Sequence, residues 1–190
     1  MKHLRALFRQ LNEKALQKKG CQPDEETFHE LKSKFNAVGY SDGLAELKGV
    51  KLLGPVLLNL AADGQTELIS CITELIKPAD RLTVFKYLDR KKRTLIHCAA
   101  EHGKVEVIEQ VLTSLSSAER LALLLLVDTS ECTALDHAAQ GAELAAVSGV
   151  LLDNLSQPHQ QELIKVSENF KKVALQDEDL IGRINSSGMQ

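Results

Sequence analysis

Apolar residues recur at helical spacing through residues 93–115. They first mark one face of a short helix and then one face of a second helix: Ile96, Ala99 and Ala100, followed by Val107, Ile108, Val111, Leu112 and Leu115. Thr94 precedes the first face and suits a helix N-cap, and Gly103 separates the two faces and suits a left-handed turn. The pattern therefore predicts two short antiparallel helices joined by a tight turn.

The same apolar pattern recurs on both sides of this segment. Alanine pairs stand at 61–62, 99–100 and 138–139, at intervals of 38 and 39 residues, and a glycine follows each pair closely. A helix pair with alanines on one side and branched residues on the other cannot bury both sides alone. We therefore expect successive helix pairs to stack on one another.

A further apolar segment follows each helix pair. Residues 78–88, 117–127 and 158–166 each open with Ser or Pro and continue with leucines at helical spacing. Ser and Pro are favourable at a helix start. The pattern predicts a third short helix in each repeat, packed on the helix before it.

The two ends of the chain lack the repeat pattern. Residues 1–50 predict helices with a break at 39–43, and we read them as an N-terminal helical cap. Residues 1–19 form a basic amphipathic pattern, for which a helix lying on a membrane or a targeting peptide stays an alternative. Residues 168–185 predict a degenerate C-terminal cap, in which acidic Asp177–Asp179 replaces the alanine pair.

Composition narrows the class of protein. The chain has 190 residues, only 4% aromatic residues and no Trp, so its core must consist of Leu, Ile, Val and Ala. Lys and Arg number 23 against 26 acidic residues, and the net charge of −3 gives no reason to expect nucleic-acid binding. The four cysteines lack paired spacing, and the longest apolar run, Leu121 to Val127, is far shorter than a membrane span. We expect a cytoplasmic protein with free thiols.

Two groups of residues invite a chemical interpretation. His97, Cys98 and His102 lie close together, but neighbouring residues on a helix point about 100° apart, and no further ligand lies at metal-binding spacing. Cys132 and His137 suggest a nucleophile pair, yet no nucleophile elbow or phosphate-binding loop is present. The sequence therefore predicts no metal, no cofactor and no enzymatic activity, unless activity resides in residues 1–50.

The segment Thr94-Leu95-Ile96-His97-Cys98-Ala99-Ala100, followed by Gly103, Glu106 and Val107, resembles the ankyrin repeat, whose pattern is Thr-Pro-Leu-His-x-Ala. It departs from that pattern at Leu95 and at Lys92, where Pro and a hairpin Gly are usual. The neighbouring repeats depart further, with Asn59 and Asp136 in place of the histidine. The resemblance implies an all-α, ankyrin-like helical solenoid with an extra short helix per repeat and helical caps. Its repeats would span 51–88, 89–127 and 128–167.

The resemblance also implies the function, which is binding of a partner protein through hairpin tips and a concave face. The family register makes Lys86 to Arg93 a basic hairpin at this edge, which favours an acidic segment in the partner. It also implies that His97 holds the start of its helix against the neighbouring hairpin through backbone hydrogen bonds. The expected partner-binding residues are Arg90, Lys91, Arg93, Glu101, His102, Thr129, Ser130, Cys132, Gln140, Leu52, Leu53, Pro55 and Asp63.

Several alternatives stay open at the level of the sequence. The long, divergent repeat is similar to those of ankyrin effectors that intracellular bacteria deliver into host cells. A cellular regulator of a transcription factor or kinase is the first alternative, with Arg90–Arg93 serving nuclear import. An enzyme or membrane adaptor acting through residues 1–50 is the second.

Overall fold

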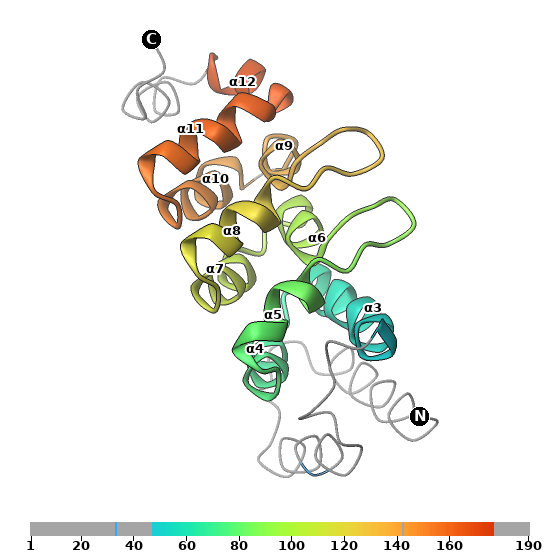
Figure 1. Ribbon diagram of the computed structural model, residues 1–190. Coiled ribbons are helices and arrows are strands. Elements are labelled where there is room, and N and C mark those ends of the chain that lie inside the picture. Colours follow the sequence, from blue (N-terminus) through green and yellow to red (C-terminus); the bar gives the residue numbers. More distant parts are fainter. Residues whose placement is uncertain (1–32, 34–46, 142, 177–190) are drawn as a thin grey trace.

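The computed structural model describes residue 33 and residues 47–141 and 143–176, and all regular structure in this part of the chain is helical (Figure 1). Helices α3 to α12 lie within the described ranges. Most of the predicted N-terminal cap and the end of the predicted C-terminal cap lie outside them. None of the described helices is long and apolar enough to cross a membrane.

The helices follow one another in groups of three along the chain. A third helix follows each helix pair, at the positions that the apolar segments predict. The first group is α3 (Leu47–Asp63), α4 (Thr66–Leu75) and α5 (Pro78–Phe85); the second is α6 (Leu95–Glu101), α7 (Val105–Thr113) and α8 (Ser117–Leu124); the third is α9 (Ala134–Ala138), α10 (Leu144–Asp153) and α11 (Gln157–Val166); α12 (Glu168–Ala174) ends the described chain.

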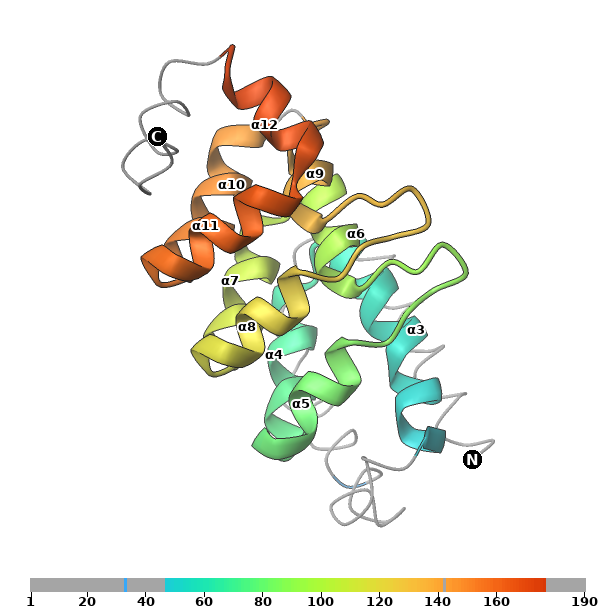
Figure 2. The same ribbon diagram turned by 45° about the horizontal axis from the view of Figure 1, so that its top comes forward.

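Equivalent helices of successive groups lie side by side in three rows (Figures 1 and 2). Helices α3, α6, α9 and α12 form one row, α4, α7 and α10 a second, and α5, α8 and α11 a third. Two loops, 86–94 and 127–133, project beyond the first row on the same side of the molecule. Because helices contact their equivalents in the neighbouring groups, repetition covers the apolar faces and builds one continuous core along the stack.

The core lies between these rows and follows the apolar periodicity. In α7, the apolar face at Val107, Ile108, Val111 and Leu112 is completely buried. The other large buried side chains are mostly Leu and Ile, and Phe85 is among the few buried aromatic residues. Burial of each such side chain contributes about 1.5–3 kcal/mol.

In the second and third groups, the third helix also closes the end of the helix before it. Arg120 of α8 donates from Nε to the carbonyl oxygens of Leu112 (2.7 Å) and Leu115 (3.0 Å), and from one terminal nitrogen to the Asn154 carbonyl oxygen (3.0 Å). The last carbonyl groups of a helix lack intrahelical donors, so these bonds satisfy groups at the end of α7. Gln160 of α11 does the same at the end of α10, at 2.9 Å from the Leu152 oxygen.

Helix α3 corrects one expectation about the first repeat. The family register places Leu52, Leu53 and Pro55 on a hairpin, but they lie within a continuous helix of 17 residues that also crosses the expected cap boundary at residue 50. Leu53 is completely buried and packs in the core. Pro55 is exposed within this helix, where its ring removes one backbone donor. The leucine spacing of this segment favours a helix over the hairpin of the family register.

Candidate functional site

The loop between α5 and α6 is organised by the carboxylate of Asp89. Its Oδ1 accepts the backbone N–H groups of Lys91 and Arg93, both at 2.8 Å. The backbone closes the loop as well, since Asp89 N donates to the Arg93 carbonyl oxygen (3.1 Å). Lys92 has φ +58°, the left-handed conformation in which glycine is usual. Burial alone would raise the pKa of Asp89, but the amides of Arg93 and Lys91 and the Arg93 guanidinium outweigh it and lower the pKa.

The loop between α8 and α9 repeats this design 39 residues later. Oδ1 of Asp128 accepts the N–H groups of Ser130 (2.7 Å) and Cys132 (3.1 Å), and Glu131 takes the left-handed conformation at φ +59°. The N–H of Thr129 donates to the Lys91 carbonyl oxygen (2.9 Å), so the two loops are joined tip to tip. Figure 2 shows them projecting together. The loops therefore form a preformed edge, which we call the loop edge (residues 89–93 and 128–132).

The Arg93 side chain forms ion pairs within the fold and is therefore not available to bind a ligand. Its Nε donates to Oδ2 of Asp89 (3.0 Å), and a terminal nitrogen donates to Oε2 of Glu101 (2.7 Å). Arg90 and Lys91, in contrast, are exposed and form no ion pair within the described part of the chain. The positive charges of Arg90 and Lys91 on the loop edge therefore have no ion-pair partner in this part of the chain, although the exposed Glu131 lies on the same edge.

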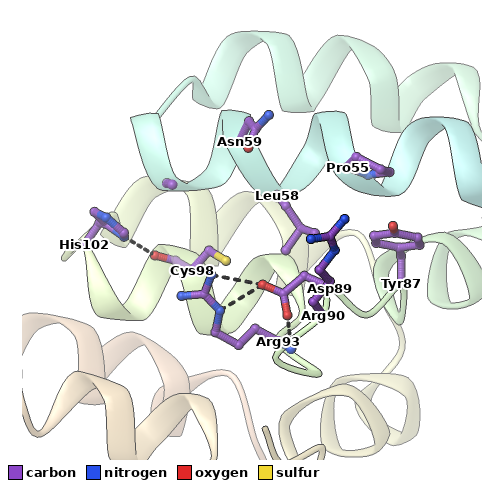
Figure 3. A pocket seen from close by; sticks show the side chains of 10 residues that line it. Pro55, Leu58, Asn59, Tyr87, Asp89, Arg90, Arg93, Cys98 and His102 are labelled. Carbon is purple, nitrogen blue, oxygen red and sulfur yellow. Dashed lines mark hydrogen bonds and ion pairs between the residues drawn. The ribbon is translucent and has the colours of Figure 1, made fainter. Parts of the chain in front are cut away.

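A pocket of about 290 Å³ lies beside this edge, between α3, the 86–94 loop and α6 (Figure 3). It is lined by Pro55, Leu58, Asn59 and Ala62 of α3, by Tyr87, Asp89, Arg90 and Arg93 of the loop, and by Cys98 and His102 at α6. The Tyr87 ring packs directly on Gly54, where an added Cβ would lie 2.0 Å from its Cγ. The wall of the pocket therefore depends on the absence of a side chain at position 54.

The surroundings of two lining groups fix the position of a hydrogen on each. Nδ1 of His102 lies 2.9 Å from the Cys98 carbonyl oxygen, and because a carbonyl only accepts, Nδ1 carries a hydrogen. Burial raises the pKa of the Cys98 thiol to about 11, although the Arg93 charge acts in the opposite direction. The thiol is therefore protonated at neutral pH and is not an activated nucleophile.

His97 caps its own helix. Its Nδ1 accepts the N–H of Thr94 (3.2 Å) and lies 2.8 Å from the Thr94 hydroxyl. Burial and the neighbouring His137, whose ring meets it edge-on at 5.6 Å between centroids, lower the pKa of His97 to about 4. His97 is therefore neutral, with its hydrogen on Nε2, and this nitrogen has no hydrogen-bond partner among the described residues. The backbone of Leu126 and Cys132 acts in the opposite direction on this pKa, so the His97 ring lies beside the segment that joins α8 to α9.

Asp136 occupies the position of His97 in the next group of helices. Its Oδ2 accepts from the N–H (2.9 Å) and the hydroxyl (2.8 Å) of Thr133. His137 instead pairs with Asp128, with 3.0 Å between Nε2 and Oδ2. Burial and the charges of Asp128 and Asp136 raise the pKa of the Cys132 thiol, so the Cys132–His137 interpretation lacks an activated thiol.

The predicted partner-binding residues divide into three groups. Most are exposed: Arg90, Lys91, Glu101, His102, Thr129, Ser130, Gln140, Pro55 and Asp63; Arg93 is partly exposed. Leu53 and Cys132 are buried, so the expectation that they contact a partner is wrong. Leu53 lies in the core, and Cys132 is covered by Asn169, whose Nδ2 lies 3.3 Å from the Cys132 Sγ. The side chain of Leu52 lies outside the described residues.

Sequence reasoning missed the residues that shape the pocket. Asn59, Tyr87 and Asp89 were not expected at the site, although the recurrence of an aspartate at 89 and 128 was a usable signal. Tyr87 had no such signal, because its position depends on Gly54 in a distant helix.

No group of three or more His, Cys, Asp or Glu side chains is placed to hold a metal ion in the described ranges. Comparison of the chain with protein-family models, with curated proteins and with solved structures gives no match. The site must therefore be interpreted from its own geometry.

Proposed function

We propose that this chain is an ankyrin-like helical solenoid that binds a partner protein through the loop edge and the adjoining exposed side of α6. The observation that carries the proposal is the loop edge itself. Its two loops are held by hydrogen bonds within each loop and by the bond from Thr129 to Lys91, and they project from the helix rows with polar side chains exposed. A preformed surface loses little conformational entropy on binding.

Three features support the ankyrin-like part of the proposal. Thr94 and His97, two residues of the family motif, cap α6, and Gly103 takes the left-handed conformation at φ +65° between α6 and α7. Helix pairs stack in register, with α6 between α3 and α9. The repeat is longer than the usual ~33 residues because a third helix follows each pair.

The charge of the loop edge indicates the kind of partner. Arg90, Lys91 and Lys92 are exposed and lack carboxylate partners among the described residues, whereas Arg93 is neutralised by Asp89 and Glu101. Uncompensated charge on a protruding edge attracts a segment of opposite charge and speeds its association. We therefore propose a partner with an acidic surface segment.

The test is capture of partner proteins from cell lysate by the intact chain, followed by mass spectrometry. The informative variant is Arg90→Glu with Lys91→Glu, because both side chains are exposed and Arg93, which the loop needs, stays in place. The control variant is Lys165→Glu with Lys172→Glu, which makes the same charge change at exposed positions of α11 and α12. A partner retained by the control and lost from the loop variant supports the proposal; equal capture by both variants contradicts it.

A further inference from the structure

We propose that the pocket beside the loop edge binds one carboxylate side chain, a Glu or Asp, of the partner's acidic segment. This inference rests on the proposed function and assigns a specific subsite within its surface. Ligand pockets usually have about 300–1,000 Å³, so a pocket of about 290 Å³ fits a single side chain rather than a large cofactor. Figure 3 shows the three segments of the chain that surround this space.

The charge balance inside the pocket favours an anion. Asp89 is the one carboxylate that lines it, and both of its oxygens are occupied, Oδ1 by two backbone amides and Oδ2 by Arg93. Arg93 is in turn satisfied by Asp89 and Glu101. Arg90 lines the same pocket, is exposed and has no ion pair in the described ranges. A carboxylate entering the pocket would supply the missing counter-ion of Arg90, and a guanidinium binds a carboxylate through two parallel hydrogen bonds.

The neutral groups of the pocket suit the rest of an acidic side chain. Asn59 is exposed and carries two N–H donors, and Tyr87 carries a hydroxyl; neither side chain forms a hydrogen bond within the described part of the chain. Tyr87 is held in place by its contact with Gly54. Pro55 and Leu58 offer apolar surface to the methylene groups of the bound side chain.

The lining of the pocket holds one guanidinium without an ion pair, that of Arg90, and this favours a carboxylate ligand over a phosphate. A phosphorylated side chain carries about −1.5 to −2 charge at neutral pH. Arg90 balances one negative charge, and the second guanidinium in the lining, Arg93, is already paired with two carboxylates. A phosphate would therefore keep part of its charge unmatched, so the geometry favours the carboxylate.

The test is a titration of the ¹⁵N-labelled full chain, followed by NMR, with three peptides that differ at one position. The peptides are acetyl-Gly-Leu-Glu-Leu-Gly-amide and its counterparts with Gln or phosphoserine in place of Glu. We expect the Glu peptide to give saturable shifts at the amides of Asn59, Tyr87 and Arg90, and the Gln peptide to bind about fivefold more weakly, as expected for loss of an exposed ion pair. Equal binding of the Glu and Gln peptides, or tighter binding of the phosphoserine peptide, would overturn the proposal.

Two variants separate a defined subsite from general attraction by positive charge. Arg90→Gln should reduce binding of the Glu peptide to the level of the Gln peptide. Lys92→Gln removes the same charge from the same loop but does not line the pocket, so binding should be retained. Equal losses in the two variants would overturn the subsite. The NMR spectrum of each variant reports directly whether the fold is intact.

The result also distinguishes the subsite from the wider surface. If partner capture depends on Arg90 and Lys91 but the peptides show no preference for Glu, the subsite is overturned and the binding surface stands. If the Glu peptide binds in the pocket but the loop variant captures the same partners as the control, the subsite stands and the proposed function fails.

Discussion

Nε2 of His137 lies 3.0 Å from Oδ2 of Asp128, and this pair is the counterpart of the Arg93–Asp89 pair in the preceding loop. Both aspartates use Oδ1 to hold two backbone amides of the loop. The partner of Oδ2 comes from the fourth residue after the aspartate in one loop and from the ninth in the other. In both loops, therefore, Oδ2 of the aspartate has a basic partner, which is Arg93 in one loop and His137 in the other.

Asp128→Ala should destabilise the protein, because the amide of the buried Cys132 loses its side-chain acceptor and His137 loses its partner. A buried polar group without a partner costs about 1–3 kcal/mol, so we expect the free energy of unfolding to fall by about 2 kcal/mol. Urea denaturation followed by circular dichroism measures this change. Asp63→Ala is the control, since Asp63 is exposed; comparable losses in both variants would contradict the role of Asp128.

The buried His97 should make the protein sensitive to mild acid. Its pKa is about 4 in the folded protein, against about 6.5 in an unfolded chain, so between these values the unfolded state binds more protons. Stability is therefore complete above about pH 6.5 and is lost as the pH falls toward 4. The linkage relation gives a loss from this group of about 2 kcal/mol at pH 5. Urea denaturation at pH 7.5, 6 and 5 measures it.

His97→Asn provides the comparison for this pH dependence. The asparagine oxygen can still accept the Thr94 amide, but it does not titrate. The variant should start at lower stability and lose about 2 kcal/mol less than the original chain between pH 7.5 and 5. Identical pH dependence in the two proteins would show that His97 is not the responsible group.

Gly54 and Tyr87 should be energetically coupled. A Cβ at position 54 would lie 2.0 Å from Cγ, the base of the Tyr87 ring, so the ring or the loop must move. We expect Gly54→Ala to destabilise the protein by about 1–3 kcal/mol, although alanine alone is favourable in a helix by about 1 kcal/mol. Thermal or urea unfolding measures the change.

A double-mutant cycle identifies the clash as the cause. In a Tyr87→Ala background the ring is absent, so Gly54→Ala should be neutral or stabilising. A loss of the same size in both backgrounds would place the strain elsewhere in α3. The cycle also bears on the pocket, because Tyr87 forms one of its walls.

The apolar periodicity of the sequence was sufficient to locate most of the described helices. Helix α6 begins at Leu95, directly after the cap expected at Thr94, α7 begins at Val105, after the turn expected at Gly103, and a third helix follows each pair. These features depend on local spacing, which one sequence displays. The caps at Thr94 and Thr133 are local in the same sense, because donor and acceptor lie three residues apart.

The errors arose where distant segments determine the structure. Leu53 was placed on a hairpin by family register, but the continuous helix α3 packs it into the core. Cys132 was expected at the surface and is covered by Asn169 of α12. The pocket could not be predicted, because it depends on the contact of Tyr87 with Gly54 across the fold.

Helix α12 shows how one buried side chain joins two groups of helices. The N-terminal amides of a helix have no acceptor within that helix. In α12 these amides, at Asn169 and Phe170, donate to Oδ1 of Asp136 at 2.8 Å and 3.0 Å. Oδ2 of the same carboxylate caps α9 through Thr133. Helix α12 therefore begins at Glu168, where Asp136 supplies its cap.

Asp136→Asn should loosen α12 more than the rest of the protein. An amide side chain has one acceptor oxygen and a donor NH₂ group, so it can cap α9 or α12 but not both. We expect hydrogen exchange at the amides of Asn169 and Phe170 to accelerate at least tenfold, as about 1.4 kcal/mol of lost protection implies. Glu109→Gln, a matched change at an exposed position, should leave these rates unchanged. Equal acceleration in α6 and α7 would indicate global destabilisation and contradict a local role for Asp136 at the start of α12.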